Sequence, residues 1–149
     1  MTIHKKKLDN LNLIQKNERV FYSKSKFYKF SIKDIYELKK ISSKKEKLIR
    51  ICLHKNDNQN IQEMIIMHKK PQTVGPLKQK KETISYHVLN GELNIFLSNR
   101  KFKIKKKESL RIPCNSFRKI KSTKNNTIFL EVTSGPFKDE QTVWKQKTL

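Results

Sequence analysis

The sequence is poor in glycine, with three residues in 149. Loops that cradle phosphate groups need closely spaced glycines, because the backbone must approach the ligand and adopt positive φ angles. The chain has no Walker-type loop, and it also lacks the G-x-S-x-G, H-E-x-x-H and C-x-x-C patterns. These absences exclude the best-known motifs for nucleotide binding, serine hydrolysis, zinc proteolysis and thiol redox chemistry.

Cysteine is scarce too. Cys52 and Cys114 lie far apart in apolar, strand-like segments rather than at the spacing of metal ligands. We interpret them as buried free thiols of a cytoplasmic protein, with one disulfide between them as the alternative. No apolar run approaches the ~20 residues of a membrane-spanning helix, and residues 1–15 lack the apolar core and cleavage site of a secretory signal. We expect a cytoplasmic location and no membrane partner.

Acidic residues and arginine are few. The chain has 13 Asp and Glu against 35 Lys and Arg, a formal net charge of +22, and its basic residues are 30 lysines and 5 arginines. Such a charge first suggests a nucleic-acid partner. However, residues 1–60 carry 16 basic and 6 acidic side chains and residues 61–149 carry 19 and 7, so neither half is a basic tail. Lys, Asn and Ile make up 58 of the 149 residues, a bias that A+T-rich codons produce. We expect no specific nucleic-acid partner.

Strand patterns dominate what remains. In residues 82–97 (ETISYHVLNGELNIFL), apolar residues recur at every second position on both sides of Asn90-Gly91, which predicts a β-hairpin with a tight turn. The segments LIRICLH and IQEMIIMH predict two adjacent antiparallel strands, and residues 127–133 predict the last strong strand. The sequence therefore indicates a mainly β chain, an antiparallel barrel or sandwich in one domain.

The N-terminal part differs from the rest. Residues 31–43 (SIKDIYELKKISS) predict a helix, because Ser31 is a favourable cap and apolar residues then follow at helical spacing. Five aromatic residues between positions 21 and 30 alternate with lysines, and we favour packing on the barrel over a platform for single-stranded nucleic acid. We divide the chain into an N-terminal segment, residues 1–45, packed on the barrel through its helix, and a barrel with a C-terminal tail, residues 46–149.

Several segments resemble one known family in order and spacing. LHKN, QEMII, YHVLNGEL and EVTSGPF, with a Gly-Pro loop and RIPCNSF between them, are similar to the WbuC-type cupins, small barrels associated with surface-polysaccharide gene clusters. The resemblance covers roughly residues 46–144. It implies a cupin double-stranded β-helix, also called a jelly-roll barrel, which agrees with the strand patterns.

The resemblance also implies a metal-site template, and this sequence departs from it. Counting from Gly91 and Pro113, the two histidines of the family's H-x-H pair fall on Leu77 and Gln79, its glutamate on Ile84 and its third histidine on Arg118. Leucine and isoleucine offer no lone pair, and a guanidinium repels a cation. We therefore expect a degenerate metal site with no bound metal and no other cofactor.

A pocket can remain without the metal. We expect it to bind a sugar or sugar nucleotide in surface-polysaccharide biosynthesis, without clear catalysis. The candidate ligand-binding residues are Gln79, Tyr86, Arg118 and His54, with Arg118 either holding an anionic group or pairing with an acidic side chain at the surface. The alternatives are a metal-independent sugar-nucleotide isomerase or epimerase, and a basic nucleic-acid-binding protein. A homodimer is the expected assembly.

Overall fold

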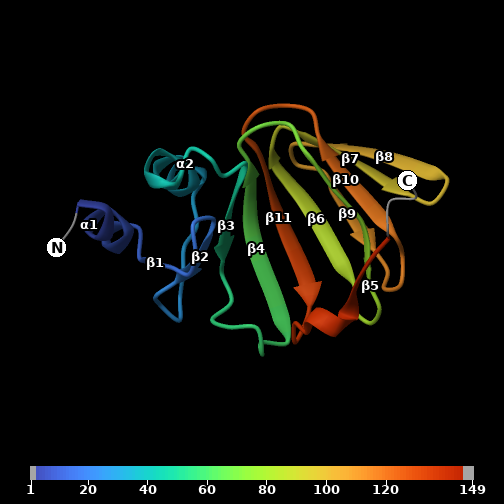
Figure 1. Ribbon diagram of the computed structural model, residues 1–149, viewed down its shortest axis with the longest axis horizontal. Helices are drawn as coiled ribbons and strands as arrows, with labels where there is room; N and C mark the ends of the chain where they lie inside the picture. The colour runs from blue at the N-terminus through green and yellow to red at the C-terminus, as the bar shows by residue number, and fades with distance from the viewer. Residues whose placement is uncertain (1–2, 146–149) are drawn as a thin grey trace.

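A computed structural model describes residues 3–145, with side chains from residue 5, and folds them into two facing β-sheets. The larger sheet has the strand order β1-β2-β3-β4-β11-β6-β9, and the smaller one has the order β12-β5-β10-β7-β8 (Figure 1). The helices are α1 (Ile3–Asn10) and α2 (Ile32–Ile41), with a 3₁₀ turn at Asp139–Gln141; the strands are β1 (Leu13–Gln15), β2 (Val20–Ser23), β3 (Leu48–Cys52), β4 (Ile61–His68), β5 (Thr73–Gln79), β6 (Ile84–Asn90), β7 (Glu92–Leu97), β8 (Arg100–Lys105), β9 (Ser109–Ile112), β10 (Arg118–Ser122), β11 (Thr127–Ser134) and β12 (Thr142–Trp144).

The strand order is that of a jelly roll, because β11 lies between β4 and β6 and pairs antiparallel with both. The mainly β class with short helices is confirmed. The antiparallel pairing of the strands in LIRICLH and IQEMIIMH is confirmed as well, since β3 pairs with β4 from Leu48 opposite His68 to Cys52 opposite Met64.

The hairpin prediction at Asn90-Gly91 was wrong. Strands β6 and β7 end and begin there, but they belong to different sheets and share no ladder. Asn90 continues the large sheet by pairing with Ile128, and its side-chain amide donates to the carbonyl of Asn126 (3.0 Å). Gly91 adopts a φ of +78°, and a Cβ there would lie 2.8 Å from Oγ1 of Thr127. Asn-Gly therefore turns a corner between sheets, a role that local patterning cannot distinguish from a hairpin turn.

Two separate apolar clusters hold the molecule together. One fills the space between the sheets and includes Tyr86, Val88, Leu93, Ile95 and Phe129. The second joins the N-terminal segment to the large sheet: Leu8, Leu13, Phe21, Ile35 and Leu38 pack with Ile49, Ile51, Ile65, Met67 and Ile128. Alternate residues of a strand face opposite sides. Strands β4 and β11 thus serve both clusters, with Met67 and Ile128 on one face and Ile66 and Phe129 on the other.

The N-terminal segment also extends the large sheet. Strand β2 pairs parallel with β3, with Val20 opposite Arg50 and Tyr22 opposite Cys52, and β1 pairs antiparallel with β2. The segment lies beyond the β3 edge of the barrel, with α2 at its upper side (Figure 1). The predicted helix over 31–43 forms over Ile32–Ile41, and the side chain of Asp34 accepts from the backbone N–H of Ser31 (2.9 Å).

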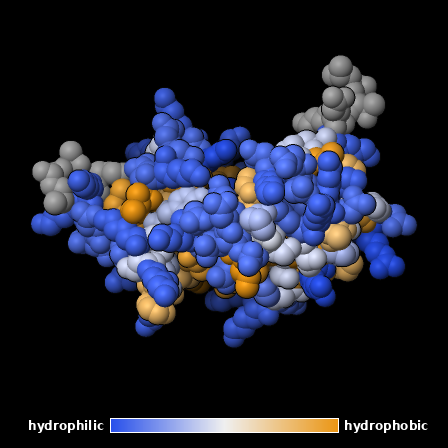
Figure 2. Space-filling model, turned by 90° about the horizontal axis from the view of Figure 1, so that it is seen from below, coloured by the Kyte–Doolittle hydropathy of each residue, from blue (hydrophilic) through white to orange (hydrophobic). Residues whose placement is uncertain are grey.

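The two thiols differ in their exposure to solvent. Cys52 is buried, as expected, whereas Cys114 is exposed in the turn between β9 and β10; both are free. Cys114 follows the end of β9 at Ile112 and precedes Asn115, which has a φ of +60°, so it belongs to an exposed turn rather than to a strand. Hydrophilic side chains cover most of the face in Figure 2, with small apolar patches between them. Within residues 3–145, no helix is long and apolar enough to cross a bilayer.

Candidate functional site

A cavity of about 650 Å³ opens between the two sheets. Register explains its lining, because one row of residues runs across the large sheet through Tyr22, Cys52, Met64, Glu131 and Tyr86, each opposite the next. All five side chains line the cavity. The smaller sheet contributes residues from β5 and β10, and the C-terminal segment closes one side. These further contributions are Val74, Leu77 and Gln79 from β5, Arg118 and Ile120 from β10, and Phe137, Asp139, Thr142 and Trp144 from the C-terminal segment.

Three of the four candidate residues meet at the deep end. Arg118 is 4% exposed and stands opposite Leu77 of β5, while Tyr86 is fully buried. The Nε–H of Arg118 donates to the Tyr86 hydroxyl (2.8 Å), and Nη1 donates to Oε1 of Gln79 (2.5 Å). Arg118 forms no ion pair with any carboxylate in residues 3–145. The expectation that it pairs with an acid at the surface was therefore wrong.

His54, the fourth candidate, lines the same cavity from a different direction. Its ring packs edge-on against Tyr22 (5.7 Å between centroids), and its Nδ1 lies 3.1 Å from both the N–H and the carbonyl of Glu63. Burial lowers the pKa of His54 below its ordinary value, so the ring is neutral at pH 7. The structure thus brings Gln79, Tyr86 and Arg118 into contact and leaves His54 apart from them.

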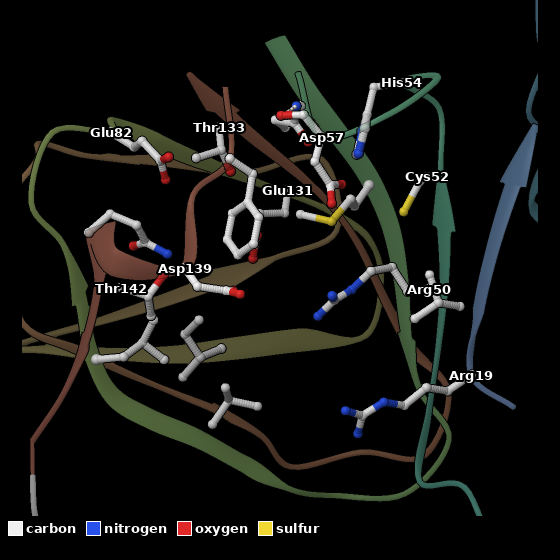
Figure 3. Close-up of a pocket in the computed structure, with 18 of the residues that line it drawn as sticks. Arg19, Arg50, Cys52, His54, Asp57, Glu82, Glu131, Thr133, Asp139 and Thr142 are labelled. Carbon is white, nitrogen blue, oxygen red and sulfur yellow. Dashed lines mark hydrogen bonds between the residues drawn. The ribbon is translucent and has the colours of Figure 1, made fainter. Parts of the chain in front are cut away.

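Charged groups of both signs face the cavity (Figure 3). Arg19 and Arg50 extend into it from the β2–β3 side, and Asp139 points in from the opposite side. Glu82 and Glu131 also line the cavity. Burial raises the pKa of Glu82, with Glu131 adding to the shift and Arg118 opposing it. Oε1 of Glu82 is buried with no hydrogen-bond partner among the described residues, so this carboxylate has an acceptor available for a ligand.

Neither the buried thiol nor the buried phenol is activated. Burial raises the pKa of the Cys52 thiol to about 11, so the thiol is protonated and a poor nucleophile. Burial also raises the pKa of Tyr86, as does the neighbouring Glu131 charge, and Arg118 only partly opposes them. Tyr86 is therefore a neutral hydroxyl that accepts from Arg118.

The positions implied for a metal do not fit one. Ile84 packs in the apolar cluster between the sheets, and Leu77 is buried. The Oε1 oxygen of Gln79 already accepts from the guanidinium of Arg118. Across residues 3–145, no three His, Cys, Asp or Glu side chains are grouped as metal ligands. A divalent cation beside a fixed guanidinium would be repelled, and we derive no chemistry through a metal.

Comparison with known proteins identifies the architecture. No protein-family model matches the chain, and no curated protein sequence is similar enough to count as a relative. Among solved structures, KdgF from Halomonas matches with a TM-score of 0.54 at 11% identity, covering 66% of this chain and 87% of that one. A cupin superfamily protein of Desulfitobacterium hafniense matches with a TM-score of 0.54 at 17% identity, covering 62% and 82%. The chain has a cupin fold.

A third match is Streptomyces PAC13, solved with uridine, with a TM-score of 0.55 at 9% identity and coverage of 70% of this chain and 82% of that one. Identities this low establish the fold alone. The WbuC type, which the resemblance implies, is a finer assignment than these similarities support.

Sequence reasoning missed Arg19, Arg50, Glu131 and Asp139. Two of them had a visible signal: Arg50 is the single charged residue in the strand LIRIC, and Glu131 is the single charged residue in TIFLEVT. A charge inside an apolar strand is costly unless it faces a polar cavity. Arg19 and Asp139 lie in polar segments and carried no such signal.

Proposed function

We propose that this cupin-fold protein binds a sugar or sugar nucleotide in its cavity, with Arg118 as the anchor for an anionic group of the ligand. A role in surface-polysaccharide biosynthesis is part of this proposal and rests on the resemblance to WbuC-type cupins. A polysaccharide gene cluster around the coding gene would support that role.

The state of Arg118 carries the proposal. A guanidinium has five N–H donors, and only two of them are used by Tyr86 and Gln79. Those two bonds fix the plane of the group, because Nε and Nη1 are held by side chains from two different strands, β6 and β5. The remaining donors are oriented and have no carboxylate bonded to them in the described part of the chain. A buried, unpaired and rigidly held guanidinium suits a carboxylate or phosphate.

The remaining lining suits a polyhydroxylated ligand. Sugar hydroxyls both donate and accept, and the cavity offers acceptors in Glu82 and Glu131 and a donor–acceptor in Thr133. Trp144, 61% exposed, and Phe137 stand at the opening, where an apolar ring face can cover a sugar or base. The uridine in the Streptomyces neighbour makes uridine nucleotides a reasonable first choice of ligand.

An isomerase or epimerase is the catalytic alternative, and the observed contacts favour it less. Proton transfer needs a base and an acid held within reach of one substrate carbon. Tyr86 is neutral and accepts from Arg118, and His54 is bonded through Nδ1 to the backbone of Glu63. We therefore propose binding without turnover.

Calorimetric titration of the full chain tests the proposal, with uridine diphosphate sugars and free uronic acids as ligands. Trp144 is the only tryptophan and lines the cavity, so its fluorescence gives a second, independent reading of binding. Replacing Arg118 with Met keeps the volume and removes the charge. We expect the affinity of an anionic sugar to fall about 10- to 100-fold, the effect of losing charge-assisted hydrogen bonds.

Arg111→Met is the matched control, because Arg111 is exposed on β9 and does not line the cavity. Wild type and Arg111→Met should bind equally. An anionic sugar that binds Arg118→Met as tightly as wild type would remove the main support for this proposal, and isomerisation of a bound sugar nucleotide would replace it with the catalytic alternative.

A further inference from the structure

Arginine is concentrated in the cavity. Three of the five arginines of the chain line it, Arg19, Arg50 and Arg118, whereas only one of the thirty lysines does. On a solvated surface lysine serves as well as arginine, and a drift toward lysine in the composition would affect all positions alike. Such a drift therefore does not explain why arginine is concentrated in the cavity. Arginine differs from lysine in its planar fork, which matches the two oxygens of a phosphate or carboxylate.

Arg19 and Arg50 form a pair at the N-terminal side of the cavity, apart from Arg118. Strand β2 runs parallel to β3, and the backbone N–H of Arg50 donates to the carbonyl of Arg19 (2.8 Å). Both guanidinium groups point into the cavity (Figure 3). The pair exists because the N-terminal segment adds β2 to the sheet, so the barrel strands alone would supply only Arg50.

The two charges are not neutralised by ion pairs. Neither Arg19 nor Arg50 has a salt bridge to any described carboxylate, and Nε of Arg50 is buried without a hydrogen-bond partner among residues 3–145. Asp57 also lines the cavity, but it accepts from the Tyr22 hydroxyl (3.1 Å) and lies 3.9 Å from Nζ of Lys16. An unpaired buried donor on a cation is costly unless an anion completes it.

We infer that Arg19 and Arg50 form a phosphate subsite at the N-terminal side of the cavity, which takes the diphosphate of a sugar nucleotide while the sugar lies toward Arg118. The sugar-nucleotide part of this inference rests on the proposed function; the phosphate subsite itself does not. Asp139 faces Arg50 from the other side of the cavity and repels a phosphate there.

Three probes separate the two arginine sites: inorganic pyrophosphate, free glucuronic acid, and the uridine diphosphate ester of glucuronic acid. We expect Arg50→Gln and Arg19→Gln each to weaken binding of pyrophosphate and of the diphosphate ester about tenfold or more, and to leave free glucuronic acid unchanged. Arg118→Met should weaken glucuronic acid and leave pyrophosphate unchanged. Asp139→Asn should tighten pyrophosphate, because it removes the opposing charge.

Arg111→Gln, an exposed arginine outside the cavity, is the control for general loss of positive charge. Arg19 is exposed, so its replacement tests the subsite even if Arg50→Gln unfolds the protein. If Arg19→Gln and Arg50→Gln both bind pyrophosphate and the diphosphate ester as tightly as wild type, the phosphate subsite is refuted, while ligand binding by Arg118 is unaffected. If pyrophosphate binds through Arg19 and Arg50 but no sugar binds, the subsite stands and the proposed function fails. If neither pyrophosphate nor any sugar binds, both are refuted.

Discussion

Replacing Tyr86 with Phe tests whether the contact with Arg118 stabilises the fold. Tyr86 is fully buried, and its hydroxyl accepts a hydrogen bond from the Nε–H of Arg118 (2.8 Å). Phenylalanine keeps the ring and its edge-on contact with Phe129, so the change removes only the hydroxyl, which is the acceptor for Arg118 and also interacts with Glu131. A buried charged donor left without an acceptor costs about 1–3 kcal/mol. For a chain of this size, about 2 kcal/mol lowers the unfolding midpoint by roughly 4–8 °C.

Tyr28→Phe is a matched control of opposite character. The Tyr28 hydroxyl is buried and has no hydrogen-bond partner in the described part of the chain. Removing an unbonded hydroxyl relieves its desolvation, so we expect unchanged or slightly higher stability. Urea unfolding of both variants, followed by circular dichroism, measures the difference as a shift in midpoint at constant m-value. Equal midpoints for the two variants would refute the assignment of a stabilising role to the Tyr86–Arg118 bond.

Three further predictions concern metal content, nucleic-acid binding and the pH dependence of stability. Elemental analysis after dialysis against zinc, iron and manganese should find no stoichiometric metal, because Leu77, Ile84 and Arg118 occupy the implied ligand positions; one retained equivalent would contradict this. Affinity for nucleic acid should collapse as salt approaches physiological strength and show no sequence preference, as expected for evenly spread lysine charge; a salt-resistant complex with one defined sequence would overturn it. Burial lowers the pKa of His68 from 6.5 to about 4, because the folded protein disfavours the charged ring. Keeping His68 neutral therefore maintains about 3 kcal/mol of the free energy of unfolding, which is fully present above pH 6.5 and is lost as the pH falls toward 4. His68→Gln should flatten the loss of stability over that interval in urea unfolding, and an unchanged slope would contradict the assignment.

Local patterns predicted the strands well and their partners less well. Alternation located β6 and β7 to within a few residues, and the capping serine located α2. Strand β6 pairs with β9 and with β11, which lies far along the chain, and no local signal reports either pairing. The same limit produced the error at Asn90-Gly91, because a corner between sheets and a hairpin turn both require positive φ at glycine.

In the candidate site too, some residues could be placed from the sequence and others could not. Counting along the family pattern singled out Gln79 and Arg118, and parity singled out Tyr86. Gln79 and Arg118 lie on the paired strands β5 and β10, and Arg118 bonds both Gln79 and Tyr86. Arg19 could not be placed in this way. It reaches the cavity through the parallel pairing of β2 with β3, which belongs to neither the family pattern nor any hairpin.

The position of β11 between β4 and β6 also has a consequence for folding during synthesis. Both neighbours leave the ribosome before β11 does, and until it arrives each presents an open hydrogen-bonding edge. Nascent chains that have not reached Thr127 should therefore lack the large sheet, and the high positive charge should keep them apart by mutual repulsion. We expect arrested chains ending before β11 to be digested rapidly by protease and chains extending through Ser134 to resist it; equal digestion of the two would show that the sheet forms without its central strand.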